Sequence, residues 1–402
     1  MNGVSLHEVR VSAPGKVILH GEHSVVYGKT AIAVSLGLRT SVVIKEAQCS
    51  LKPSINFHFT SVDLNQEIEL NPITEKLFNP PLLSETTTEL RWTEPDKLDH
   101  YKHLSNVEEF LNQTLPSFGS LKSIQQNALR GFLYMFSGIY GSTKLPVSSM
   151  DVSIDSELTV GAGTGSSASF AVSLAGAIIQ LIKMKTGPDQ GGFSLKEKKI
   201  ISGWAFNCER IMHGSPSGID NSTCTFGSLV SFRKGVEPRV LDLGLNLRVL
   251  LVDTGVSRET KALAAKVAAS RQWNTAAVHS IMEACDHVTH KATEILENIS
   301  KTKHITEAKV QYQRLEELWD MNHCLLAALG VSHPSLEEIR TAARSHGFAS
   351  KLTGAGGGGY AIVLIPPSSQ QSKVAKLTEE LVSRGFRVTD TQLGGAGVTL
   401  DS

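Results

Sequence analysis

A loop rich in glycine and serine that runs directly into an apolar helix constrains this chain more than any other feature. Residues 161–168 read Gly-Ala-Gly-Thr-Gly-Ser-Ser-Ala, after a strand-like segment at Met150–Ile154 and before an uncharged helical run at residues 169–182. Glycine permits positive φ and a close approach of the backbone to a ligand. The start of a helix offers unpaired N–H groups and a positive dipole end, which suit a phosphate. The pattern therefore favours either a phosphate-binding loop or a tight structural turn, and it lacks the lysine of an ordinary P-loop.

Length, charge and cysteine content exclude several classes of protein. The 402 residues suggest two domains, since a domain usually holds about 100–200 residues. Lys plus Arg and Asp plus Glu each total 39, and no basic stripe appears, which argues against nucleic-acid and anionic-membrane partners. The five cysteines are odd in number and form no C-x-x-C pair, a pattern typical of reduced thiols in a cytosol-like compartment.

One uncharged stretch, Leu158–Ile182, is long enough to cross a bilayer. Its first half is the glycine loop, so we expect a helix only over Ala168–Ile182, too short to span and better suited to the protein core. Met1–Val11 lacks the apolar segment of a signal peptide, and the final three residues are not a peroxisomal signal. We therefore expect a cytoplasmic protein.

The pattern of elements indicates two α+β domains, 1–234 and 235–402. The first is rich in strands, with short strands predicted at Val9–Ser12 and Val17–His20 around a Pro14-Gly15 turn. Residues 60–105 read as loops with short helices. Long helical patterns fill Thr260–Ile299 and Ile305–Leu329, and Ser335 with Glu338 predicts a capping box for the next helix.

A second polar segment spans residues 209–221. Glu209 lies in the last turn of a predicted apolar helix, where the helix dipole disfavours a carboxylate, so it requires a counter-charge such as Arg210 or a metal ion. Asp220 lies in the Gly/Pro/Ser turn beyond. The alternative is a solvated glutamate and a turn-forming aspartate.

Two further segments complete the set. Lys16 follows Ser-Ala-Pro-Gly among apolar residues, and it is either a site residue or a surface lysine whose stem covers the core. Residues 353–359 form a second glycine loop between core-like segments, which favours an internal loop over a linker. Together these segments supply a phosphate cradle, ligands for Mg²⁺, a lysine for developing charge and an aspartate for the nucleophile, as phosphoryl transfer requires.

These motifs resemble those of the mevalonate kinase family, within the GHMP small-molecule kinase superfamily, over essentially the whole chain. The resemblance lies in the opening Ser12–Lys16 with Gly-Glu-His at 21–23, the glycine loop, the segment from Glu209 to Asp220, and the glycine motifs at 351–359 and 394–398. Galactokinases continue Gly-Glu-His with Thr-Asp-Tyr, whereas this chain has Ser24-Val25-Val26.

The resemblance implies an N-terminal domain like ribosomal protein S5 domain 2 and a ferredoxin-like C-terminal domain. It implies phosphorylation of the mevalonate 5-hydroxyl by ATP with Mg²⁺ in isoprenoid and sterol precursor synthesis. Asp220 would accept the hydroxyl proton and Lys16 would contact Asp220 and the γ-phosphoryl group. Ser167 and Glu209 would hold Mg²⁺. ATP would contact Lys16, Ser156 and the loop residues Gly161, Ala162, Gly163, Thr164, Gly165, Ser166 and Ser167.

His23, Glu22 and Thr260 are the candidate substrate contacts, although Thr260 also suits a helix N-cap. Three positions, Val160, Thr164 and Gly255, depart from the family pattern. Thr164 is expected either to disturb packing behind the loop or to bond the loop backbone through its hydroxyl. Residues 55–120 match the family poorly, so the adenine pocket stays unassigned.

The resemblance also implies a homodimer and feedback inhibition by prenyl diphosphates that compete with ATP. Two alternatives stay open: another GHMP kinase acting on phosphomevalonate, a sugar or homoserine, and a binder that kept the fold without catalysis. The pairs His287/His290 and His20/His23 lack a third ligand in register, which favours structural or solvated histidines over a zinc site.

Overall fold

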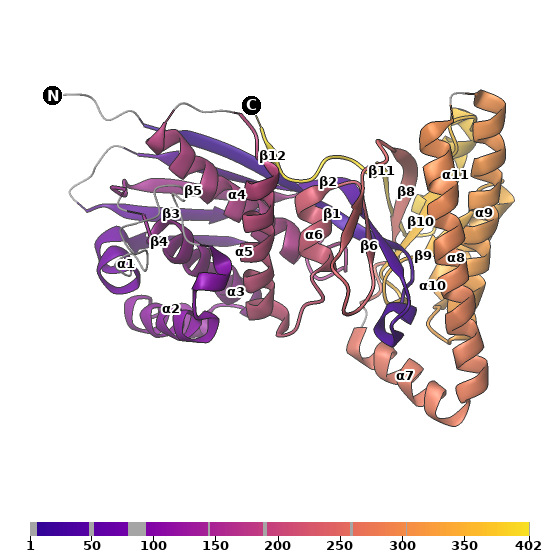
Figure 1. The fold of residues 1–402 in the computed structure, drawn as a ribbon, viewed down its shortest axis with the longest axis horizontal. Helices are drawn as coiled ribbons and strands as arrows, with labels where there is room; N and C mark the ends of the chain where they lie inside the picture. The colour runs from indigo at the N-terminus through magenta and orange to yellow at the C-terminus, as the bar shows by residue number, and fades with distance from the viewer. Residues whose placement is uncertain are drawn as a thin grey trace.

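A twelve-stranded sheet runs through the computed structural model, which describes residues 6–47, 52–78, 94–143, 145–187, 191–257, 260–302 and 304–401 (Figure 1). Its main path is β4-β3-β5-β2-β11-β8-β10-β9, and all pairs are antiparallel except β3 with β5. The strands are β1 (Glu8–His20), β2 (Ala31–Glu46), β3 (Ser54–Phe59), β4 (Leu64–Glu69), β5 (Met150–Ser156), β6 (Leu229–Phe232), β7 (Arg239–Leu241), β8 (Leu247–Asp253), β9 (Ser350–Leu352), β10 (Tyr360–Leu364), β11 (Arg387–Leu393) and β12 (Thr399–Leu400).

The helices form two groups, one that extends from one end of the molecule to its middle and one at the other end (Figure 1). The first group is α1 (Leu70–Leu77), α2 (His100–Thr114), α3 (Ser123–Met135), α4 (Ser166–Thr186), α5 (Leu195–His213) and α6 (Ile219–Phe226). The second is α7 (Thr260–Trp273), α8 (Thr275–Lys301), α9 (Ile305–Ala328), α10 (Pro334–Ser345) and α11 (Gln371–Ser383). This mixture of helices and antiparallel strands is the α+β class that the sequence predicts.

Strand β2 joins the two ends of the molecule. Its residues 40–46 pair with β5, its residues 31–34 pair with β6, and Leu36 pairs with Leu393 of β11. One apolar cluster lies among α1–α5 and the first strands, another lies among α7, α8, α10, α11 and β8–β10, and a third fills the space between them. The two ends of the molecule are therefore joined by the sheet and by the third cluster.

Helix α4 passes through the first apolar cluster. It begins two residues before and ends four residues after the predicted Ala168–Ile182, because Ser166 and Ser167 already form its first turn. Among the described residues it is the one helix long and apolar enough, by length and composition alone, to cross a membrane, and 78% of the relevant window is buried inside the protein. Small residues on α4 let β1 approach closely, since a Cβ at Gly176 would lie 3.0 Å from Val11 Cγ1.

The predicted turn at Pro14-Gly15 is wrong, because β1 runs through it without a break. The register against β2 shifts between Pro14 and Lys16, and a bulge of this kind tolerates a residue with no N–H. A Cβ at Gly15 would lie 2.5 Å from Leu158 Cδ2 and 2.6 Å from the Thr164 carbonyl oxygen. Glycine is therefore needed here for close contact with the glycine loop rather than for a reversal of the chain.

Two other predictions are corrected. Residues 60–105 are not only loops and short helices, since Leu64–Glu69 forms β4 in a hairpin with β3. The N-cap of α10 is His333, whose ring accepts the Ser335 N–H, with Pro334 in the first turn; Ser335 and Glu338 therefore do not form the expected capping box. Proline favours the first helical position because its missing N–H would have no partner there.

Candidate active site

The predicted motifs surround a cleft of about 1,080 Å³. Its walls come from β1 and the turn after it, the glycine loop, the end of α5, the start of α6, the start of α7 and the second glycine loop. The cleft lies where the two ends of the molecule meet, a common place for ligand sites. Segments more than 300 residues apart in sequence therefore share one cavity.

The glycine loop ends as the N-terminus of α4. Gly161, Gly163 and Gly165 have φ of 77°, 82° and 75°, values that a residue with a side chain rarely adopts. Gly165 precedes the first turn of α4, and within the described part of the chain no side chain caps this helix. The first-turn N–H groups are thus left to face the cleft, which is the arrangement that binds anions.

Two polar residues connect this loop to the neighbouring strands. Ser156 lies at the end of β5, and its hydroxyl oxygen is 2.8 Å from that of Thr40. The same hydroxyl accepts the Leu158 N–H. Thr164 is buried, and its carbonyl accepts the Lys16 N–H at 2.8 Å. The Thr164 hydroxyl has no hydrogen-bond partner in the described part of the protein, so the expectation that it bonds the loop backbone is wrong.

Four of the predicted polar residues meet at the end of this loop. Lys16 Nζ lies 3.1 Å from Asp220 Oδ1, and the Ser167 hydroxyl donates to Glu209 Oε1 at 3.2 Å. The Lys16 side chain is 10% exposed and that of Asp220 is 30% exposed, so the pair is shielded on one side and open to the cleft on the other. An ammonium, two carboxylates and a hydroxyl therefore line one end of the cavity.

Asp220 lies in the first turn of α6, not in the irregular turn that the sequence predicts. A carboxylate at a helix N-terminus is stabilised by the dipole and by the free N–H groups. Of the two counter-charges that the sequence suggests for Glu209, Arg210 is wrong and the metal ion stays a prediction. The Arg210 guanidinium lies over the Tyr101 ring at 5.1 Å, and Lys16 is the cation that acts on Glu209.

Burial raises the pKa of Glu209 well above its usual range, and the charge of Asp220 raises it further. The Lys16 ammonium and the Ser167 hydroxyl oppose this rise without cancelling it. Two carboxylates thus share one ammonium, which leaves this corner short of positive charge.

The donor set fits Mg²⁺. This ion prefers oxygen ligands and usually takes one or two carboxylates together with substrate phosphates and water. The described residues hold no group of three or more His, Cys, Asp or Glu side chains arranged for a metal. Glu209 and the Ser167 hydroxyl would hold the ion from the protein side, with nucleotide phosphates and water supplying the other ligands.

The three candidate substrate contacts lie in different settings. His23 lines the cleft and its Nε2 lies 2.8 Å from the Ala355 carbonyl oxygen. Thr260 is exposed at the first position of α7 and also lines the cleft. Its predicted role as N-cap stays a prediction, because the preceding residue, 259, lies outside the described residues. Glu22 also lines the cleft, and its buried side chain is paired with Lys351, so its role as a direct substrate contact stays a prediction.

Sequence reasoning missed two parts of the cleft. His213, the last residue of α5, lies 3.0 Å from the Ser167 hydroxyl through Nε2, and its position at the helix end beside Glu209 was the available signal. The far end of the cleft is largely apolar. It is lined by residues from β3, the turn after it, α3 and α4, among them Phe59, Val62, Ile124, Asn127 and Phe170. These share no local motif, so only the folded chain brings them together.

Comparison with known proteins agrees with this geometry. The family models for the N-terminal domain and the C-terminal domain of GHMP kinases match residues 128–228 and 308–383. The mouse mevalonate kinase is 34% identical over 398 residues, covering 98% of this chain and 95% of the mouse protein. The Arabidopsis thaliana mevalonate kinase is 32% identical over 406 residues, covering 98% and 99%. The chain belongs to the mevalonate kinase family of GHMP kinases.

Solved structures agree on the fold. The mevalonate kinase of L. major, determined with R-mevalonate, has a TM-score of 0.67 at 20% identity, covering 96% of each chain. The Methanococcus jannaschii mevalonate kinase has a TM-score of 0.65 at 22% identity, covering 100% of each chain. The two family-model matches fall on either side of the predicted domain boundary at 234/235, which itself stays a prediction.

Proposed function

We propose that this kinase transfers the γ-phosphoryl group of ATP to the 5-hydroxyl of mevalonate. The proposal is supported by the mevalonate kinases that match it over nearly their whole length. The observation that carries it is the Lys16–Asp220 pair beside Ser167 and Glu209 at the N-terminus of α4. This is where a bound nucleotide would present its last phosphate to a hydroxyl.

In the proposed reaction Asp220 accepts a hydrogen bond from the substrate hydroxyl and then takes its proton. The hydroxyl oxygen forms a bond to the γ-phosphorus while the bond to the β-γ bridging oxygen breaks, which releases ADP. The transition state is loose, so the aspartate has to orient the hydroxyl rather than act as a strong base. Lys16 pairs with Asp220 at 3.1 Å and neutralises negative charge on the transferred group.

The nucleotide would lie along the cleft. Backbone N–H groups of residues 161–167 would bind the phosphates, with Ser156 close behind them. The apolar end near Phe59 and Phe170 would hold the adenine, which fills the part of the site that the sequence left unassigned. Mg²⁺ bound by Ser167 and Glu209 would neutralise phosphate charge when present.

Mevalonate carries a carboxylate, so its far end needs donors. We propose His23 and Thr260 for this role, because both line the cleft beside the Lys16–Asp220 pair. His23 offers a ring nitrogen and Thr260 offers a hydroxyl together with the start of α7.

Family membership supports four further expectations. We propose domains at 1–234 and 235–402, a homodimer in the cytoplasm, and inhibition by prenyl diphosphates. The inhibition by prenyl diphosphates would use two parts of the cleft. The backbone amides of the glycine loop would bind the diphosphate, and the apolar end would hold the prenyl chain. Competition between a prenyl diphosphate and ATP, measured as a rise in the KM for ATP alone, tests it.

ADP release with a panel of substrates tests the main proposal. The purified protein is assayed with ATP and Mg²⁺ and with mevalonate, phosphomevalonate, galactose or homoserine. We expect turnover on mevalonate that is abolished when Mg²⁺ is chelated. Turnover on another substrate with none on mevalonate would replace this function with that of another GHMP kinase. ATP binding without turnover on any would favour a binder.

A further inference from the structure

His23 holds an unusual backbone conformation at the mouth of the cleft. Its φ is 57° and its ψ is −44°, and the N–H of Ser24 donates to the carbonyl oxygen of Glu22 at 2.6 Å. This is a three-residue γ-turn of the positive-φ kind, which is rare and strained for a residue with a side chain. Such strain persists only where the surroundings determine the conformation.

The surroundings of His23 include a buried ion pair. The Lys351 ammonium contacts the carboxylate of Glu22, the residue before His23, and both side chains are 0% exposed. Lys351 lies on β9, 329 residues further along the chain. The contact therefore attaches the turn after β1 to the strand that precedes the second glycine loop.

Two further contacts reinforce this attachment. The Thr353 hydroxyl donates to the Ile18 carbonyl oxygen at 2.7 Å, and His23 Nε2 lies 2.8 Å from the Ala355 carbonyl oxygen. Both partners on the second glycine loop follow Lys351 within four residues. The imidazole of His23 is thus held from the loop side while its backbone is held through Glu22.

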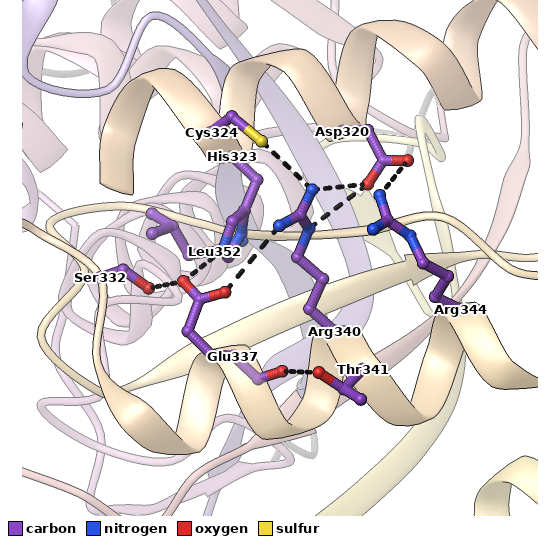
Figure 2. Close-up of polar contacts among 9 residues, drawn as sticks. All are labelled: Asp320, His323, Cys324, Ser332, Glu337, Arg340, Thr341, Arg344 and Leu352. Carbon is purple, nitrogen blue, oxygen red and sulfur yellow. Dashed lines mark hydrogen bonds and ion pairs between the residues drawn. The ribbon is translucent and has the colours of Figure 1, made fainter. Parts of the chain in front are cut away.

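Strand β9 is in turn held by a polar network between α9 and α10 (Figure 2). His323 Nδ1 accepts the Leu352 N–H at 3.1 Å, and His323 Nε2 lies 2.9 Å from Glu337 Oε1. Glu337 also accepts from Ser332, and burial lowers the pKa of His323 despite the nearby carboxylate. A neutral His323 is the form whose Nδ1 can accept this N–H, so the network fixes the strand from which Lys351 projects.

We propose that Lys351 is a positioning residue for phosphoryl transfer, which acts through Glu22 to hold His23 in its strained turn facing the substrate end of the cleft. The inference rests on the proposed function for the reaction and for the identity of the substrate. A buried pair of this kind is poor evidence for stability, since two apolar residues of similar size often replace such a pair without loss. The pair is instead placed where it determines the geometry of a cleft residue.

A double replacement separates positioning from stability. Lys351→Met alone leaves the Glu22 charge buried without its partner, so it destabilises the protein for reasons unrelated to His23. Glu22→Met with Lys351→Met removes both charges at similar side-chain volume. The control is Glu46→Met with Lys185→Met, because this 2.6 Å ion pair joins a buried glutamate to a half-buried lysine and its residues do not line the cleft.

We call Glu22→Met with Lys351→Met the cleft double variant. We expect it to unfold at the urea midpoint of the parent and to keep the ATP dissociation constant within twofold. We expect its KM for mevalonate to rise at least tenfold. The control pair should leave that KM within twofold. A cleft double variant with the parent's KM would overturn the proposal. If it does not fold, Glu22→Gln, which weakens the pairing and keeps the shape, takes its place with the same expectations.

A second readout does not depend on the substrate. The ¹³C-labelled histidine ring signal of His23, assigned by its loss in His23→Gln, should move in the cleft double variant and stay in place in the control. An unmoved signal would overturn the positioning role. If the parent protein fails to turn over mevalonate, the proposed function fails, and this signal still decides the role of Lys351.

Discussion

Replacing Asp220 by asparagine is the sharpest perturbation of the site. Asparagine has the same shape, so it keeps the first turn of α6 intact and removes the negative charge 3.1 Å from Lys16 Nζ. The substrate hydroxyl then loses its proton acceptor. Loss of a general base usually costs about 10²–10⁴ in rate, which corresponds to about 3–5 kcal/mol of barrier.

The effect on stability should be smaller. The Lys16 ammonium loses its partner, but Asp220 is 30% exposed, so water can reach the ammonium from the cleft. We therefore expect a loss of about 1–2 kcal/mol in the free energy of unfolding, below the value for a fully buried pair. ATP affinity should change less than kcat, because the loop amides that bind phosphate are unchanged.

Steady-state ADP release at saturating ATP and mevalonate gives kcat, calorimetry gives the ATP dissociation constant, and urea unfolding gives stability. Asp242→Asn is the matched control, since Asp242 is exposed on the segment after β7 and lies outside the cleft. A kcat for Asp220→Asn within tenfold of the parent, with stability retained, would refute the role given to this carboxylate.

Three further predictions follow from individual contacts. Gly165→Ala should lower kcat at least tenfold, because the new Cβ would lie 2.9 Å from Lys16 Cγ at a φ of 75°. Gly161→Ala is the control, since it carries similar backbone strain with nothing within 4 Å of its Cβ. Equal losses of kcat in both variants would contradict the argument from the Lys16 contact. Arg39→Lys should lower the free energy of unfolding in urea by about 2–4 kcal/mol. The guanidinium donates to carbonyl and hydroxyl oxygens on β1 and on the C-terminal segment, and a lysine cannot reproduce this set of hydrogen bonds. A loss below about 1 kcal/mol would contradict this role for Arg39. Burial lowers the pKa of His103, so the neutral ring contributes stability above about pH 6.5 that is lost as the pH falls. Between about pH 6.5 and 5.5, the free energy of unfolding of the parent should fall by up to about 1.4 kcal/mol per pH unit more than that of His103→Gln. Parallel pH profiles of the two proteins would contradict this prediction.

Local chemistry explains what the sequence could predict. The glycine loop was predictable because positive φ and a helix N-terminus require glycine and serine within a few residues. The end of α5 was predictable because Glu209 is a carboxylate near a helix C-terminus, where the dipole disfavours it. The convergence of Lys16 with Asp220 came from resemblance to a family, since no local rule relates residues so far apart.

The rest depended on contacts that no short window contains. Pro14-Gly15 has the composition of a turn, yet the space left by Leu158 and Thr164 makes it a bulge in a continuous strand. Glu22 reads as a free carboxylate until Lys351 is placed against it. The apolar end of the cleft combines β3, α3 and α4, each of which is an ordinary core-facing element alone.

The central claim is that four polar side chains and the N-terminus of α4 form one phosphoryl-transfer site. A crystal structure with ADP, Mg²⁺ and mevalonate tests it most directly. We predict the phosphates against the N–H groups of residues 161–167, the metal on Ser167 and Glu209, and the 5-hydroxyl within hydrogen-bond distance of Asp220. Phosphates bound elsewhere, or a hydroxyl remote from both Lys16 and Asp220, would contradict the claim.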